Sequence, residues 1–197
     1  DYKHVNLGVA FPGLNISLVK DALKHLSNRL FYLNVDNDRY WFDVTPNLRR
    51  EMEERKERFD EQEDVIPELK KRLEKLINKG SLGGVHVFTP SADIPDDFAI
   101  RLCVLPPRAP HSSTSELAVN AAAEMLRTKG TGPRLHQNRL IFLAPDYNTL
   151  PRLKEQIRTY LAWKSIVDDV KQTRLVLDNL QANQAEQKSE AASKALN

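Results

Sequence analysis

The sequence predicts an α+β or α/β fold: a winged-helix-like N-terminal part, then a small mixed sheet covered by helices, then a long C-terminal helix. Three patterns lead to this prediction: a helix followed by a hairpin over residues 16–44, short apolar strands alternating with helices, and a polar helical tail. We expect a winged-helix-like domain at 1–60, connecting helices at 61–82, an α/β domain at 83–166 and a polar helical extension at 167–197.

The first helix is predicted from the spacing of its apolar residues. Asn15 or Ser17 can cap its start, and apolar residues then recur at intervals of three and four, which places them on one face. These residues are Ile16, Val19, Leu23, Leu26 and Leu30. The opposite face carries polar and basic side chains.

Two β-rich runs, residues 31–35 and 39–44, follow this helix directly, and Asp36-Asn37-Asp38 between them has the composition of a tight turn. A helix followed by a hairpin is typical of the end of a winged-helix domain, whose helix enters the major groove of DNA while the hairpin lies on the backbone. The predicted DNA contacts are Lys20, Lys24, His25, Asn28, Arg29 and Arg39. The alternative is a packing or protein-docking helix, because any surface helix has a polar face and cations are few here.

A strongly charged helix is predicted over residues 47–59. Glu51 precedes Arg55 by four positions, and Glu54 precedes Arg58 by four, a spacing at which opposite charges stabilise a helix by about 0.2–0.5 kcal/mol per pair. This pattern favours a solvated connecting helix over a nucleic-acid-binding tail.

Three short apolar runs, residues 85–88, 99–105 and 139–144, predict the strands of the second part. A helix is expected over residues 116–128, between the last two strands, and a long helix from Asn148 onward. This order favours a mixed or parallel sheet covered by helices.

The glycine-rich segment at 130–133 lacks the lysine and the spacing of a phosphate-binding loop, and Pro133 removes a backbone donor, so a helix-ending turn is favoured. Arg134 and Arg139 remain candidates for contact with an anion. The five histidines show no paired metal spacing, and a single cysteine, Cys103, cannot build a structural zinc site.

Two further polar clusters are interpreted as structural. Asp93, Asp96 and Asp97 are expected to form a solvated loop, because a hard cation needs more ligands and a glycine-supported loop. The serines near His111 are expected to cap a helix, because nothing orients them as a nucleophile and a base. We therefore predict no catalytic residue, no metal site and no cofactor held by this chain.

The charge of the chain is close to balance, with 29 basic and 27 acidic residues and a net charge of +2. Nucleic-acid binding would therefore need a local basic face rather than a global field. The single cysteine and the absence of an apolar leader or spanning segment indicate a cytoplasmic location without a membrane.

Several stretches together resemble one protein family. They are LKHLSNRL at 23–30 with YL at 32–33, DRYWFD at 38–43 with PN at 46–47, SADIPDD at 91–97, GTGPR at 130–134 with Asn138 and FLAPD at 142–146, and YLAWKSI at 160–166. In this order they are similar to the C-terminal part of large bacterial and archaeal ATP-binding proteins grouped as domain-of-unknown-function family 499, some of which are P-loop ATPase components of phage-exclusion systems. The resemblance implies an AAA-type ATPase region upstream, where ATP and Mg²⁺ would bind. It transfers no catalytic role to this chain.

These inferences predict a non-catalytic accessory module of a larger ATPase that contacts DNA through the winged helix. The alternative is a protein-docking or regulatory scaffold of the ATPase without nucleic-acid contact, which the near-neutral charge and the alanine-rich helix at 116–128 favour. The expected partners are DNA, the upstream ATPase domain of the same protein and further copies of the chain.

Overall fold

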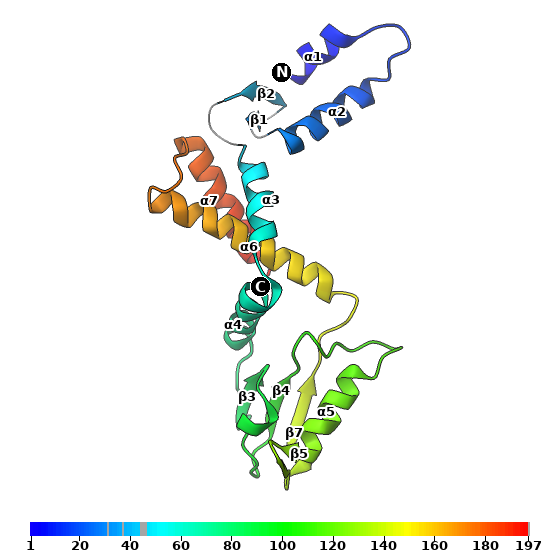
Figure 1. The fold of residues 1–197 in the computed structure, drawn as a ribbon, viewed down its shortest axis with the longest axis vertical. Coiled ribbons are helices and arrows are strands. Elements are labelled where there is room, and N and C mark those ends of the chain that lie inside the picture. Colours follow the sequence, from blue (N-terminus) through cyan, green and yellow to red (C-terminus); the bar gives the residue numbers. More distant parts are fainter. Residues whose placement is uncertain (31, 37, 44–46, 197) are drawn as a thin grey trace. The chain divides into compact units, whose positions relative to one another are not determined.

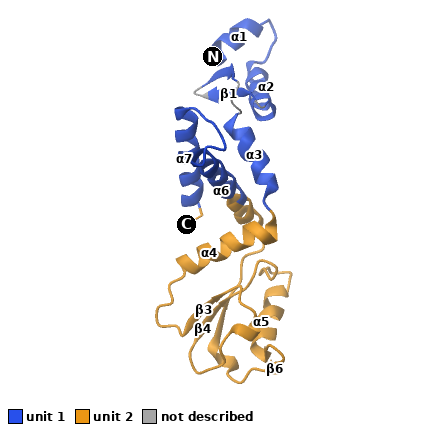
Figure 2. Ribbon diagram, turned by 60° about the vertical axis from the view of Figure 1, so that its left-hand side comes forward, with its two compact units in different colours: residues 1–59, 158–195 blue, residues 60–157, 196–197 orange. Residues whose placement is uncertain are grey.

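The computed structural model describes residues 1–30, 32–36, 38–43 and 47–196, which divide into two compact units (Figure 2). Unit 1 consists of Asp1–Phe59 and Arg158–Ala195, and unit 2 consists of Asp60–Ile157 with Leu196. The mixed helical and strand content, the small sheets and the long helix in the C-terminal part confirm the predicted α+β class (Figure 1). The chain leaves unit 1 after Phe59 and returns to it at Arg158.

Unit 1 begins with two helices, α1 (Tyr2–Val9) and α2 (Ile16–Arg29). Asn15 caps α2 as predicted, because its side-chain oxygen accepts a hydrogen bond from the Ser17 N–H at 3.0 Å. The helix ends where Leu30 adopts an extended backbone.

The predicted hairpin follows α2 as the strands β1 (Leu33–Asp36) and β2 (Arg39–Phe42), which pair in antiparallel register with Asn34 opposite Trp41. Asp38 has a φ of 64°, a left-handed conformation that aspartate tolerates in tight turns. Three residues of the predicted strands and turn, Phe31, Asn37 and Val44, lie outside the described residues.

Three helices form the core of unit 1: α3 (Leu48–Arg58), the C-terminal part of α6 (Leu150–Lys171) and α7 (Asn179–Lys194). The buried residues of this core are Leu48, Met52, Ala162, Trp163, Ile166, Val167 and Ala185. The prediction that α3 is a solvated connecting helix is therefore wrong for one of its faces, which buries Leu48 and Met52.

Both ion pairs predicted on α3 are present. Arg55 Nε lies 2.7 Å from Glu51 Oε1, and Arg58 Nη2 lies 2.9 Å from Glu54 Oε1. Arg55 also contacts α6, where its Nη1 lies 2.6 Å from Asp169 Oδ2. The Arg55 guanidinium therefore joins α3 to α6 in addition to stabilising α3 itself.

Unit 2 contains a three-stranded sheet in the order β3 (Gly84–Val87), β4 (Arg101–Val104) and β7 (Leu140–Leu143). Both strand pairs are parallel, so the sheet is the parallel one of the two predicted alternatives. The connection from β3 to β4, described in full, contains one 3₁₀ turn, Ser91–Asp93, and no α-helix.

Helices cover both faces of this sheet. On one face α5 (Leu117–Arg127) packs its small side chains against a cluster that includes Phe142. On the other face α4 (Ile66–Leu76), which follows a π-helical turn at Glu61–Val65, lines an apolar hollow together with Leu143. Phe142 and Leu143 are consecutive in β7, so their side chains point to opposite faces of the sheet.

Candidate functional site

The α2–hairpin surface, formed by α2, β1 and β2, carries all the residues predicted to contact DNA. Lys20, Lys24, His25, Arg29 and Arg39 are exposed, and Asn28 is half-buried. Within the residues that the structure describes, none of the lysines and arginines in this set makes an ion pair. Their charges are therefore available to an anion outside the chain.

Asn47 holds the α2–hairpin surface together. Its side-chain nitrogen donates hydrogen bonds to the carbonyl oxygens of Ser27 in α2, at 2.9 Å, and of Leu33 in β1, at 2.6 Å. Its side-chain oxygen accepts from the Arg49 N–H at 2.9 Å and so caps α3. Because Asn47 is 7% exposed, one buried amide joins the helix, the hairpin and the core helix α3.

The apolar side of the same surface is open. Of the residues of α2, Ser27 is buried, whereas the predicted apolar face is exposed or half-buried, with Ile16 54% and Leu26 46% exposed. Further exposed apolar side chains of α2 and the hairpin region are Leu18, Leu30, Tyr32, Val35, Trp41 and Phe42. Exposed apolar side chains concentrated in this way are common at interaction surfaces.

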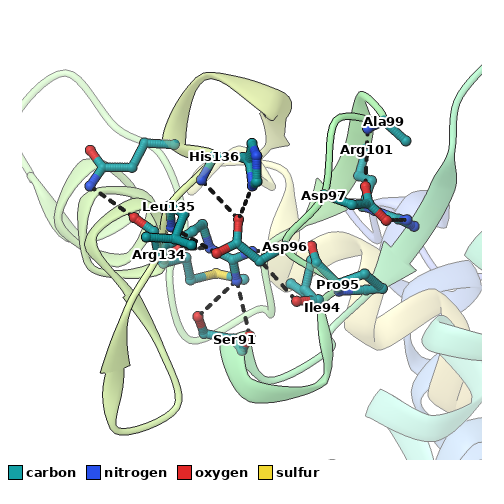
Figure 3. A network of polar contacts seen from close by, with 12 residues as sticks. Ser91, Ile94, Pro95, Asp96, Asp97, Ala99, Arg101, Arg134, Leu135 and His136 are labelled. Carbon is teal, nitrogen blue, oxygen red and sulfur yellow. Dashed lines mark hydrogen bonds and ion pairs between the residues drawn. The ribbon is translucent and has the colours of Figure 1, made fainter.

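Arg134, predicted as an anion contact, is 2% exposed and has its donors directed at protein oxygens (Figure 3). Its Nε donates to the Met125 carbonyl at 2.9 Å. The two terminal nitrogens donate to the carbonyls of Ser91, Ile94 and Pro95 at 3.0, 3.4 and 3.2 Å, and one of them also donates to the Ser91 hydroxyl at 3.3 Å. This side chain therefore joins the 91–95 segment to the end of α5, a structural role that the sequence did not indicate.

Asp96 also joins the loop after β3 to a later part of the chain, next to Arg134. Its carboxylate accepts hydrogen bonds from the backbone N–H groups of Leu135 and His136 at 2.7 and 2.9 Å, and its Oδ1 lies 3.1 Å from His136 Nδ1 (Figure 3). Asp97 pairs with Arg101. The prediction of a solvated loop is therefore wrong for Asp96, whose side chain is 10% exposed and is engaged by residues of a later segment, whereas the side chain of Asp97 remains 47% exposed.

The Leu135 N–H, followed by the backbone and ring of His136, lowers the pKa of Asp96 to about 2. In the unfolded chain this carboxyl group has its ordinary pKa of about 3.8. The unfolded state therefore takes up the proton first, so the carboxylate stabilises the fold above pH ~4 and this stabilisation is lost as the pH falls towards ~2.

We expect Asp96→Asn to make the free energy of unfolding of unit 2 depend less on pH below about 4, because the substitution removes this titrating carboxyl group. Urea unfolding, followed by circular dichroism between pH ~2 and ~6, measures the effect. Asp93→Asn is the matched control, because Asp93 is exposed on the same loop. An Asp96→Asn chain whose midpoint varies with pH as steeply as that of the unaltered chain would contradict the assignment.

The glycine-rich segment beside Arg134 forms a short hairpin of β5 (Thr128–Lys129) and β6 (Gly132–Pro133), which follows the end of α5 as expected for a helix-ending turn. Gly130 has a φ of 61° and lies so near Ala92 that an added Cβ would meet it at 3.3 Å. Arg139, the other predicted anion contact, is half-buried, and its Nε has no hydrogen-bond partner among the described residues.

Across the described ranges, no group of three or more histidine, cysteine, aspartate or glutamate side chains could hold a metal ion. The same ranges contain no helix with the length and apolarity needed to cross a membrane.

Sequence reasoning did not indicate the structural roles of Asn47 and Asp96, which shape these sites. Asn47 is the first residue of a predicted helix, so its capping role had a signal, whereas its bonds to Ser27 and Leu33 had none. Asp96 bonds residues about 40 positions later in the chain. Local patterns cannot report such long-range partners.

No family model matches the chain, and neither a curated protein nor a solved structure matches it.

Proposed function

We propose that this chain is a non-catalytic accessory module of a larger ATPase and that its α2–hairpin surface contacts DNA as a winged helix does. The ATPase context rests on the family resemblance alone. The observation that supports DNA contact is the set of cations on α2 and β2 that are exposed and unpaired among the described residues.

The length of α2 and the positions of its cations are compatible with contact to a DNA duplex. α2 contains 14 residues and is long enough to lie in the major groove, which admits an α-helix. Lys20, Lys24 and Arg29 of α2 would then meet phosphates at the groove edges, while Arg39 of the hairpin meets the neighbouring backbone. Phosphate contacts of this kind position a protein on DNA without reading its sequence.

The test is fluorescence anisotropy with a labelled duplex and a chain carrying Lys20→Ala, Lys24→Ala and Arg29→Ala. We expect the duplex affinity to fall about tenfold or more at moderate salt, because three phosphate contacts are removed. The matched control removes the same charge elsewhere, with Lys71→Ala, Lys75→Ala and Lys194→Ala at exposed positions. An equal loss in both chains, or no loss in the first, would overturn the proposal.

A second candidate function is protein docking or regulation of the ATPase without DNA contact. The exposed apolar side chains of α2 and the hairpin favour it, with Phe42 73% and Leu18 59% exposed. Leu18 and Arg29 are eleven residues apart in α2 and therefore lie on the same side of the helix, so the docking face and the cations overlap there. Docking alone is supported if duplex affinity is the same for the unaltered chain and for the chain that lacks the α2 cations.

A further inference from the structure

A hollow of about 400 Å³ in unit 1 is lined by both tryptophans of the chain. Trp163 of α6 is 8% exposed, so it belongs to the inner wall, whereas Trp41 of β2 is 37% exposed and is accessible from the solvent. Asn34 also lines the hollow, because it stands opposite Trp41 in the hairpin and therefore on the same face. The hairpin, α3, α6 and α7 thus converge on one partly open aromatic site.

Two cations line the same hollow. Arg49 at the start of α3 and Lys188 of α7 are both exposed, and neither makes an ion pair in the part of the chain that the structure describes. The acidic residue of the lining, Asp178, caps α7 by accepting from the Gln181 N–H at 2.7 Å. The site therefore combines aromatic rings with cations that can hold an anion.

Buried amides complete the lining. Asn34 and Gln181 are 6% and 7% exposed, and the side-chain nitrogen of Gln181 lies 3.5 Å from the side-chain oxygen of Asn34. Amide groups can both donate and accept hydrogen bonds, as the edges of nucleobases require. An apolar pocket with a few convergent polar groups is the usual composition of a ligand site.

We propose that this hollow binds an unpaired nucleobase of single-stranded nucleic acid. The base would stack on Trp41, and the adjoining phosphates would meet Arg49 and Lys188, which is the combination that proteins use to bind single strands without sequence preference. A base inside a duplex cannot enter, because its faces are covered by its neighbours. The inference goes beyond the duplex contact proposed for α2 and does not depend on it, because the residues differ.

Intrinsic fluorescence gives a direct test, since the two tryptophans that line the hollow are the only ones in the chain. We expect an oligothymidylate to quench the emission at low salt, and a duplex of equal length to quench it much less. No quenching by the single strand, with the chain shown to be folded by circular dichroism, overturns the proposal. Equal quenching by the duplex overturns it too.

Substitutions then locate the contact, with affinity measured by anisotropy of a labelled oligothymidylate. Trp41→Ala should weaken binding roughly tenfold, and Trp41→Phe, which keeps a stacking ring, should weaken it less. Phe42→Ala is the control, because Phe42 is the next residue of β2, is 73% exposed and points to the other face of the hairpin. Equal affinities for Trp41→Ala and Phe42→Ala would overturn the assignment.

A charge test stays informative even if Trp41→Ala weakens folding. Arg49→Ala with Lys188→Ala should reduce the slope of log affinity against log salt by about 1.4, or about 0.7 per phosphate contact for a single strand. Lys194→Ala, an exposed position on the same helix outside the hollow, should leave the slope unchanged. An unchanged slope in the double variant contradicts the proposal. Removing the α2 cations should leave the quenching intact, which separates this site from the proposed duplex contact.

Discussion

Arg134→Ala is expected to lower the free energy of unfolding of unit 2 by about 3–4 kcal/mol, the largest effect that we predict. The substitution leaves the carbonyls of four residues without their donor and opens a cavity at a position that is 2% exposed. Arg134→Lys keeps the charge but loses the planar fork of donors, so we expect a loss of about 2 kcal/mol.

The lone cysteine provides a reporter for this prediction. Cys103 lies in β4 of unit 2 and is 1% exposed, and burial raises the pKa of its thiol to about 11, so it should react slowly until the unit opens. Thiol labelling across a urea series measures the stability of unit 2 without any signal from unit 1. Arg108→Ala, at an exposed arginine of the same unit, should change the stability by no more than about 0.5 kcal/mol. A labelling midpoint for Arg134→Ala equal to that of Arg108→Ala would contradict the structural role.

Asn47→Ala is expected to destabilise unit 1 by about 3 kcal/mol. It removes the cap of α3, worth about 1 kcal/mol, and leaves the buried carbonyls of Ser27 and Leu33 without a donor, at a cost of about 2 kcal/mol. Because these bonds join α2 to the hairpin, the same change should disorder the surface that we propose for DNA.

Asn47→Asp separates the two contributions. Aspartate is as good a cap as asparagine, but it has no side-chain N–H to donate, so we expect it to lose about 2 kcal/mol. Tryptophan fluorescence during urea unfolding measures these values, because Trp41 and Trp163 both lie in unit 1. Asn183→Ala, at an exposed position of α7, should be near neutral. An aspartate variant as stable as the unaltered chain would show that the bonds to Ser27 and Leu33 do not matter.

The local elements of this chain could be predicted from its sequence. The α2 helix, its Asn15 cap and the hairpin depend on residues that are close in the sequence. The helix and its cap form where the pattern placed them, and the hairpin is present, with β1 extending to Asp36 and β2 ending at Phe42. The strands of unit 2 were also found, because apolar runs bounded by glycine and proline are local signals. The sequence could not show that α3 and α7 pack into one core, because residues 60–157 of unit 2 stand between them in the chain order.

The site residues were harder to predict for a physical reason. Cations such as Lys20 and Arg29 are exposed on the free chain both in DNA-binding proteins and in proteins that do not bind DNA. A sequence pattern that places them on the surface therefore does not distinguish the two functions. Arg134 resembled a surface cation beside a glycine-rich turn, yet its acceptors include backbone carbonyls about 40 positions earlier in the chain. Every residue has a backbone carbonyl, so the residue types in the sequence do not reveal which carbonyls accept hydrogen bonds. The role of Arg134 therefore becomes visible only in the structure.

The central claim, that the α2–hairpin surface contacts DNA, is tested most directly by the salt dependence of duplex affinity. The account predicts that log affinity falls linearly with log salt concentration, and that the chain lacking the Lys20, Lys24 and Arg29 charges has a slope shallower by about three units. The same slope in both chains, or an affinity too weak to measure even at low salt, would contradict the claim.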